Sequence, residues 1–187
     1  MAHELAKRGN TAEAIENYRA ALKLDPQLPG IHFELAEMLN TLATAEGSQE
    51  AESEYRSALA VNPRDEQSER RLGDMALQAS DLQKAFEHYS RALQLQPHDP
   101  EANIGLAKVL MSRDEPLKAE PLLQRALQLD PANAVAHYRL SAINEMVRRR
   151  VGLRPGSLHR EDHRNAHHIY RHRSGQNHLS PGRIGRA

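Results

Sequence analysis

The chain has 187 residues, enough for one domain with a hydrophobic core. It has no cysteine, which excludes disulfides, thiolate metal sites and cysteine nucleophiles. Ala (26) and Leu (24) supply most of the hydrophobic residues, whereas Ile and Val together supply only 11. Because Ala and Leu are strong helix formers and strands favour β-branched side chains, this composition favours an all-α fold.

The net charge is zero at pH 7 with neutral His, but this total combines two regions of opposite charge. Residues 1–147 hold 15 basic and 23 acidic side chains, for a net charge of −8. Residues 148–187 hold 10 basic and 2 acidic side chains, for +8. No apolar run approaches the roughly 18 residues of a membrane-spanning helix, so we expect no membrane span.

Four segments of similar sequence recur along the chain, and each ends in proline. They are AIENYRAALKLDP, AESEYRSALAVNP, AFEHYSRALQLQP and AEPLLQRALQLDP, ending at Pro26, Pro63, Pro97 and Pro131. The prolines are therefore spaced 37, 34 and 34 residues apart. Matching columns hold small residues (Ala14, Ala51, Ala85 and Ala119; Ala21, Ala58, Ala92 and Ala126) and a bulky one (Tyr18, Tyr55, Tyr89 and Leu123). A further pair of columns is Leu35-Ala36, Leu72-Gly73, Leu106-Ala107 and Leu140-Ser141.

Within each segment the apolar residues follow the i, i+4, i+7 spacing of one α-helical stripe. The proline ends one helix and begins a turn. Two helices and two short turns fill one period, which predicts a repeated helix pair. In chain order, the predicted helices are 2–8, 11–24, 29–42, 48–61, 66–79, 82–95, 100–113, 116–129 and 134–147.

These small, bulky and proline columns resemble the signature of the tetratricopeptide repeat family. The resemblance covers roughly residues 1–147, with about four units and a broken fifth. It implies a right-handed α-solenoid of antiparallel helix pairs with a concave groove.

The first and second units depart from the regular period. Met1 enters the repeat in the middle of a first helix, because Ala2 occupies the column of Ala36. Either the true start lies upstream, in a segment that could carry a signal peptide, or the first unit is trimmed. The default location is the cytoplasm, and a lost signal segment would make it secreted or periplasmic. In the second unit, the three extra residues fit the Thr44–Ser48 stretch, where they either lengthen the helices or form a longer turn. Gly47-Ser48 favours the turn.

The repeat pattern fails at the C-terminal end of the chain. Leu140 is in register, but Arg148-Arg149-Arg150 follow, and the next four columns fall on Leu153, Ser157, Arg160 and Asn165. The chain therefore divides into a repeat domain (1–147) and an Arg/His-rich tail (148–187). Because the fifth unit loses its second helix, we expect Leu140 and Ile143 to lie at an open end, with fraying or self-association there.

Three interpretations of the tail remain open. The first is a disordered basic extension that contacts nucleic acid or an acidic surface. The second is a metal site formed by His159, His163 and His167, which recur at i+4. The third, which the abrupt loss of register favours, is translation past a frameshift in a GC-rich gene. The low Lys content (5) beside Arg (20) indicates such a genome and a bacterial source.

The sequence contains no catalytic motif, so we expect no enzymatic activity, cofactor or metal. His32 and Glu34 suggest an acid–base pair, but no second histidine follows, and His137 occupies the equivalent place in the fifth unit. A structural role for His32 is therefore favoured.

The family resemblance implies that the first helix of each pair lines the groove that binds a peptide or a partner helix. The residues at those positions are Phe33, Glu37, Asn40, Arg70, Asp74, Gln78, Ile104, Lys108, Met111 and Tyr138. In the family, a Lys, Asn and Arg set binds peptide carboxylates. Here only Asn40, Arg70 and Lys108 could contribute to such a set. Glu37 and Asp74 lie between them, which argues against such a clamp.

The leading hypothesis is a non-enzymatic scaffold that binds a protein or peptide partner in its groove. One alternative is a docking or regulatory fragment of a larger enzyme, such as a transferase or peptidase. A weaker alternative is contact of the basic tail with nucleic acid or an acidic surface, and of these a nucleic-acid partner is not favoured.

Overall fold

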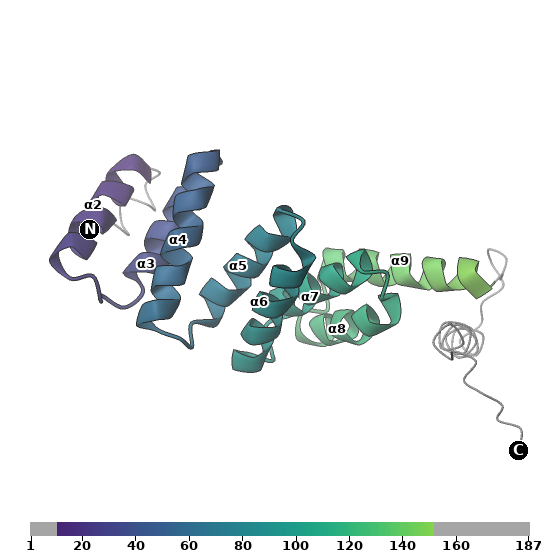
Figure 1. Cartoon of the computed structure of the whole chain (residues 1–187). Helices are drawn as coiled ribbons and strands as arrows, with labels where there is room; N and C mark the ends of the chain where they lie inside the picture. Colours follow the sequence, from purple (N-terminus) through teal and green to yellow (C-terminus); the bar gives the residue numbers. More distant parts are fainter. Residues whose placement is uncertain (1–10, 152–187) are drawn as a thin grey trace, which may run out of the picture.

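The computed structural model describes residues 11–151, and these form eight α-helices without a strand. The helices are α2 (Thr11–Leu24), α3 (Ile31–Asn40), α4 (Ala45–Val61), α5 (Glu66–Gln78), α6 (Leu82–Leu95), α7 (Pro100–Ser112), α8 (Pro116–Leu129) and α9 (Ala134–Val151). They follow one another along an elongated array (Figure 1). The expected helix 2–8 and the histidines of the tail lie outside the described residues.

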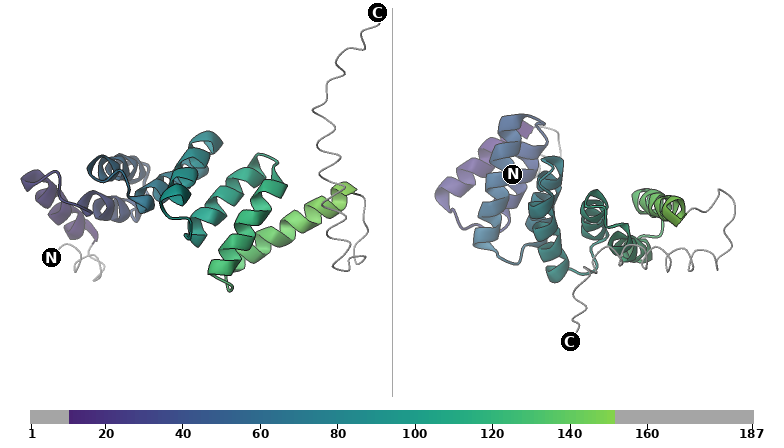
Figure 2. Two further views of the ribbon diagram at one scale, coloured as in Figure 1. Left: turned by 90° about the horizontal axis from the view of Figure 1, so that it is seen from below. Right: turned by 45° about the vertical axis from the view of Figure 1, so that its right-hand side comes forward.

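The helices pair as the repeat predicts, and the all-α solenoid is confirmed. Each of α3, α5 and α7 packs most closely against the helix that follows it, and the pairs stack in chain order (Figure 2). We call α3, α5, α7 and α9 the first-helix layer, and α2, α4, α6 and α8 the second-helix layer. None of the helices in the described part of the chain is long and apolar enough to cross a membrane.

The repeat columns form the core. The alanines of the first small column are fully buried, and the bulky column is at most 3% exposed. Tyr89 lies between two glycines of the first-helix layer, because a Cβ on Gly73 would lie 3.0 Å from the Tyr89 ring. A Cβ on Gly105 would lie only 2.2 Å from Cε1 of the same ring. The missing side chains at these two positions therefore let α5 and α7 approach α6.

The three extra residues of the second unit lengthen a helix and do not form a longer turn. The turn between the paired helices has a left-handed residue at the same place in each unit, namely Ala43, Ser80 and Asp114. The next residue is the N-cap in each case, so the second helix begins at the same register position in each unit, and α4 has 17 residues where α6 and α8 have 14.

The favoured interpretation of Gly47 as the end of a helix is therefore wrong. Gly47 lies in the first turn of α4, and its N–H donates to Oγ1 of the N-cap Thr44 at 3.0 Å. A Cβ at this position would lie 2.9 Å from the Leu39 carbonyl oxygen of α3. Glycine serves close packing here rather than helix termination.

The last helix, α9, continues to Val151, four residues beyond the predicted end at 147. Arginine is a good helix former, and Arg149 bonds Glu145 one turn back at 2.8 Å. Arg150 reaches the Asp114 carboxylate in the α7–α8 turn at 2.6 Å. The arginine run therefore extends the helix and attaches it to the preceding unit.

The expectation that Ile143 lies at an open end is also wrong. Ile143 and Val147 are at most 1% exposed, and they pack with Leu123 and Ala126 of α8. Leu140 is partly buried against the same cluster. These side chains face the fourth unit, so α9 covers its apolar side. Self-association through this end stays a prediction.

Candidate functional site

The residues predicted to line the groove all lie in the first-helix layer. Phe33, Glu37 and Asn40 are on α3, and Arg70, Asp74 and Gln78 are on α5. Ile104, Lys108 and Met111 are on α7, and Tyr138 is on α9. Their surroundings differ from unit to unit, and these differences separate side chains that hold the fold from side chains that are free to bind.

Glu37 is partly buried, and side chains of two neighbouring helices hold its carboxylate. The Tyr55 hydroxyl on α4 donates to Oε1 of Glu37, and Arg71 of α5 donates to Oε2 at 2.7 Å. Phe33 packs on the Tyr55 ring, with the ring centroids 5.7 Å apart. Burial, together with the Glu37 carboxylate, raises the pKa of Tyr55 above its usual range. Glu37 and Phe33 therefore connect α3, α4 and α5.

Asp74 has the same role one unit later. The Tyr89 hydroxyl on α6 donates to Oδ1 of Asp74 at 2.6 Å, and the Arg71 guanidinium lies 3.8 Å from Oδ2. Burial and the Asp74 carboxylate raise the pKa of Tyr89. We call Glu37, Tyr55, Arg71, Asp74 and Tyr89 the tyrosine–carboxylate network. Buried hydroxyls need acceptors, and these two carboxylates supply them.

In the fourth unit both partners of this contact are replaced. Leu123 stands in the column of Tyr55 and Tyr89, and it is fully buried. Lys108 stands in register with Glu37 and Asp74, and it has no hydrogen-bond or ion-pair partner among the residues that the structure describes. With no tyrosine hydroxyl to satisfy, this position does not need an acceptor. Lys108 is therefore available for contacts outside the chain.

Arg70 is tied to the turn before α7. Its Nε lies 3.2 Å from Oδ2 of Asp99, and both side chains are largely buried. Glu66 and Glu101 belong to the same acidic cluster. Burial, together with the charge of Asp99, raises the pKa of Glu66. A side-chain hydrogen bond with Asp99 and burial raise the pKa of Glu101. Arg70 thus balances part of a carboxylate cluster.

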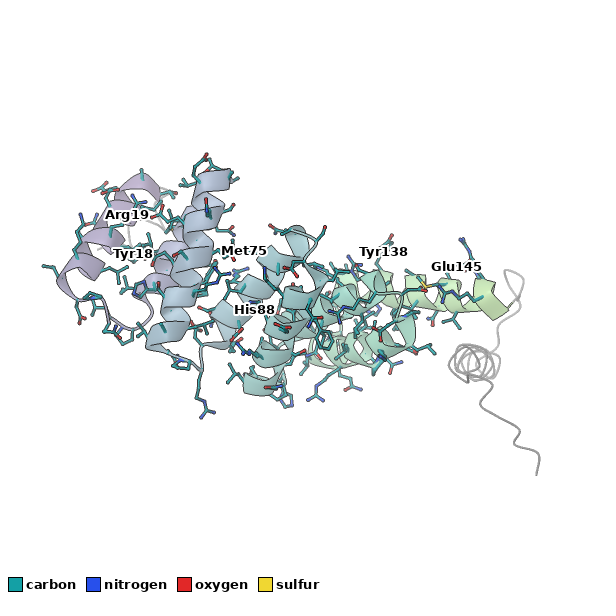
Figure 3. All side chains as sticks on the ribbon, in the orientation of Figure 1. Tyr18, Arg19, Met75, His88, Tyr138 and Glu145 are labelled. Carbon is teal, nitrogen blue, oxygen red and sulfur yellow. The ribbon has the colours of Figure 1, made fainter. Side chains whose placement is uncertain are left out.

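The other predicted groove residues range from buried to exposed. Ile104 is 6% exposed and belongs to the core cluster of α7, α8 and α9, so its expected place in an open groove is wrong. Met111 packs partly against that cluster. Asn40 and Gln78 are exposed near the ends of their helices. Tyr138 is 72% exposed and projects from α9 (Figure 3).

Two histidine–carboxylate contacts were not predicted from the sequence. His32 Nδ1 lies 2.6 Å from Glu54 Oε2, and His88 Nδ1 lies 2.7 Å from Glu69 Oε2. The two pairs are in register with their residue types exchanged: His on the first helix in one unit, and Glu in the next. In the sequence, the exchange of His and Glu between these two columns was the signal that could have identified the contacts. The structural role predicted for His32 agrees with these contacts.

His32 and its equivalent in the fifth unit, His137, also contact the turn that precedes their helix. His32 Nε2 lies 3.0 Å from the Pro26 carbonyl oxygen, and His137 Nε2 lies 2.9 Å from that of Pro131. Both contacts span six residues, and they connect the start of a first helix to the proline that precedes it. Each imidazole therefore stabilises a turn between units.

The structure also contains two equivalent grooves in the second-helix layer. The α2–α4 groove has a volume of about 320 Å³ and is lined by residues of α2, α3 and α4. The α4–α6 groove, about 410 Å³, is lined by residues of α4, α5 and α6, among them Met75 and His88 (Figure 3). The repeat places corresponding residues in the two walls, for example Arg19 with Arg56 and Glu50 with Lys84. The described residues include no cluster of three or more His, Cys, Asp or Glu side chains that could hold a metal.

Two family profiles match the chain. Residues 55–152 match the tetratricopeptide repeat domain of cytochrome c-type biogenesis protein H, and residues 2–39 match a tetratricopeptide repeat. No curated protein sequence matches the chain.

Solved structures with the same fold include a crystal structure of MamA, with 17% sequence identity and a TM-score of 0.72, covering 95% of this chain and 96% of that one. Another is PilF of Pseudomonas aeruginosa, with 21% identity and a TM-score of 0.69, covering 91% of this chain and 72% of that one. A third is MamA from residue 41 to the end, of Desulfovibrio magneticus RS-1, with 19% identity and a TM-score of 0.61, covering 72% and 74%. At these identities the likeness concerns the fold. With its matching profiles, buried repeat columns and paired helices, the chain belongs to the tetratricopeptide repeat family.

Proposed function

We propose that this protein is a non-enzymatic scaffold, and that the C-terminal half of its first-helix layer binds a peptide or helix of a protein partner. Lys108, Met111 and Tyr138 form the contact surface. Lys108 without a partner on α7 is the observation that supports this most directly, since its counterparts Glu37 and Asp74 hold tyrosine hydroxyls.

The chemistry of these three side chains suits a protein segment. Tyr138 offers a large, rigid and amphipathic surface, of the kind enriched at protein interfaces. Met111 supplies an adaptable apolar neighbour. Lys108 adds a cation for an acidic or carbonyl group of the partner. No nucleophile, base and orienting group come together in this layer to suggest chemistry on a substrate.

The test is a photo-cross-linking experiment on the full chain. A photoreactive amino acid at position 138 is expected to capture a discrete partner in cells of the source organism, and the same group at Gln83 on the opposite layer is not. Lys108→Glu is expected to abolish the capture from position 138. Capture that is unchanged by Lys108→Glu would overturn the proposal.

Arg70 is a poor target for this test, because its ion pair with Asp99 is largely buried and its removal would disturb the fold. The profile that matches residues 55–152 makes proteins of cytochrome c biogenesis the first partners to examine. A captured protein of another kind leaves the surface proposal unchanged and identifies a different process.

A further inference from the structure

Arg71 lies at the centre of the tyrosine–carboxylate network, beside two carboxylates of the first-helix layer. Its Nη2 donates to Oε2 of Glu37, in the preceding unit, at 2.7 Å. Its Nη1 lies 3.8 Å from Oδ2 of Asp74, one turn further along its own helix. A guanidinium at this register position is therefore held by one carboxylate from each of two successive first helices.

The same register position in the fifth unit holds another arginine, Arg139 of α9. Like Arg71, it directly precedes the leucine column of the first helices. The residues in register with the two carboxylates are Lys108 of α7 and Ala142 of α9. In place of its two carboxylate neighbours, this guanidinium therefore has a second cation and a methyl group.

Neither of these two cations has a partner among residues 11–151. Nε of Arg139 is buried without a hydrogen bond, and no other nitrogen of this guanidinium forms a hydrogen bond or an ion pair there. Nε of Arg71 also lacks a hydrogen bond, but its terminal nitrogens have the two carboxylates. The side chains of Arg139 and Lys108 are partly buried. They have lost part of their hydration without gaining an anion that would compensate for it.

The carboxylates around this pair of cations are engaged elsewhere. No Asp or Glu lies three or four residues from Lys108 or Arg139 along either helix. The acidic side chains of α7, α8, α9 and their flanking turns, and Asp74 of α5, have partners of their own. These partners are Asp99 for Glu101, Arg70 for Asp99, Arg150 for Asp114, Lys118 for Glu115, Gln124 for Glu120, Asn133 for Asp130, Arg148 and Arg149 for Glu145, and Tyr89 for Asp74. The positive charge of the pair is therefore not balanced within the described part of the chain.

The surface of α9 next to Arg139 is apolar. Val135, Tyr138 and Ala142 follow the i, i+3, i+7 spacing of one helical stripe. Val135 and Tyr138 are 46% and 72% exposed, and Tyr138 projects outward from α9 (Figure 3). An anion bound at Arg139 would thus have apolar side chains beside it, as an acidic residue within an amphipathic protein segment requires.

We infer that Lys108 and Arg139 bind the carboxylate of an Asp or Glu side chain in the partner segment. This inference rests on the proposed function, because it names the chemistry of the partner at that same surface. The chain itself shows which group fits, since the Glu37 carboxylate has the equivalent place beside Arg71. A guanidinium can bind a carboxylate through two parallel hydrogen bonds, and the second cation adds to the attraction.

The test measures the binding of two probe peptides to the isotope-labelled full chain by NMR. The probes are acetyl-Leu-Glu-Leu-amide and acetyl-Leu-Gln-Leu-amide, which differ in one side-chain carboxylate and have no terminal one. We expect the Glu peptide to shift the Nε–H signal of Arg139 and the amide signals of α9. It should bind about tenfold more tightly than the Gln peptide, because a hydrogen bond to a charged group is lost in the latter. Arg139→Gln should remove this preference.

Ala142→Asp places an internal carboxylate where Asp74 lies beside Arg71. It should occupy the site and weaken binding of the Glu peptide about tenfold. Gln128→Glu is the matched control, because it changes the net charge equally at an exposed residue of α8, in the other layer. It should leave the binding unchanged, and thermal unfolding establishes that the variants fold. Equal weakening in the two variants, equal binding of the two peptides, or tighter binding of inorganic phosphate than of the Glu peptide would overturn the inference.

The cross-link from position 138 separates this inference from the proposed function. A cross-link that depends on Lys108, together with equal binding of the two probes, would overturn the carboxylate site and leave the scaffold proposal standing. Selective binding of the Glu peptide without a cross-linked partner would support the carboxylate site and overturn the scaffold proposal.

Discussion

The units built from α3 to α6 and the unit built from α7 and α8 use the same register position in different ways. In the first two, Glu37 and Asp74 accept hydrogen bonds from buried tyrosines and are joined through Arg71. In the unit of α7 and α8, which is the fourth unit of the chain, Lys108 has no partner among the described residues, and the tyrosine column holds Leu123. A position in a repeat is therefore free for binding only when the core residue beneath it needs no hydrogen-bond acceptor from it.

Tyr89 marks the junction between these two regions. Its hydroxyl belongs to the tyrosine–carboxylate network, and its ring fills the space left by Gly73 of α5 and Gly105 of α7. Repeat proteins are stabilised by contacts between neighbours, so a change at this junction should affect both regions. The predictions below test the contrast between the regions, from the largest expected effect to the smallest.

The largest effect is expected at Gly105. In Gly105→Ala the new Cβ would lie 2.2 Å from Cε1 of the buried Tyr89 ring, so ring or helix must move. We expect the free energy of unfolding in urea to fall by about 2–4 kcal/mol. Gly73→Ala is the control, because its Cβ would lie at 3.0 Å and the higher helix propensity of Ala offsets the crowding. Equal losses in both variants would contradict the packing described.

The tyrosine hydroxyls should contribute a smaller amount. Tyr89→Phe removes the donor to Asp74 and keeps the ring, so we expect a loss of about 1 kcal/mol. Tyr55→Phe should behave alike, because its hydroxyl serves Glu37 in the same way. Urea unfolding followed by circular dichroism measures both. A loss below the error of the measurement in both variants would show that the network does not stabilise the fold.

The missing contact of the fourth unit can be rebuilt. Leu123→Tyr alone overfills a packed site and should destabilise the protein by about 1–3 kcal/mol. Adding Lys108→Glu supplies the acceptor found at Glu37 and Asp74, and we expect about 1 kcal/mol of favourable coupling. A double-mutant cycle of unfolding free energies isolates this coupling. Additive effects would show that the two columns are independent.

The smallest effect concerns the acidic cluster around Arg70. Because the pKa of Glu66 is raised in the folded protein, the protonated form is favoured there. Its contribution to stability is therefore present at acid pH and is lost as the pH rises through the folded pKa. We expect Glu66→Gln to raise the Tm by about 1–2 °C at pH 7 and by less near pH 4. Glu87→Gln, at an exposed carboxylate, is the control. A gain independent of pH would argue against the assignment.

Much of the fold could be predicted from the repeat columns. The buried alanines and the bulky column were identified by spacing alone, because each unit meets its neighbours in the same way and the same positions are buried every time. The length of α4 was not predicted, since Gly47 looks like a helix end in sequence. Only the structure shows that it lies against the Leu39 carbonyl group.

The candidate site was predicted less completely. Register placed ten residues in the first-helix layer, but it could not distinguish Glu37, which holds Tyr55, from Lys108, which holds nothing among the described residues. Ile104 was misplaced because helix register assumes an open face, whereas the α7–α9 cluster covers it. The joint change of Tyr to Leu123 and of carboxylate to Lys108 was visible in the sequence and becomes meaningful once the two columns are known to touch.

The contrast between Glu37 and Lys108 is tested most directly by truncating both side chains to alanine in otherwise identical proteins. We predict that Glu37→Ala lowers the free energy of unfolding by about 2 kcal/mol and keeps the cross-link from position 138. Lys108→Ala should change stability by less than about 0.5 kcal/mol and lose the cross-link. A stable Glu37→Ala variant together with a destabilised Lys108→Ala variant would contradict the account.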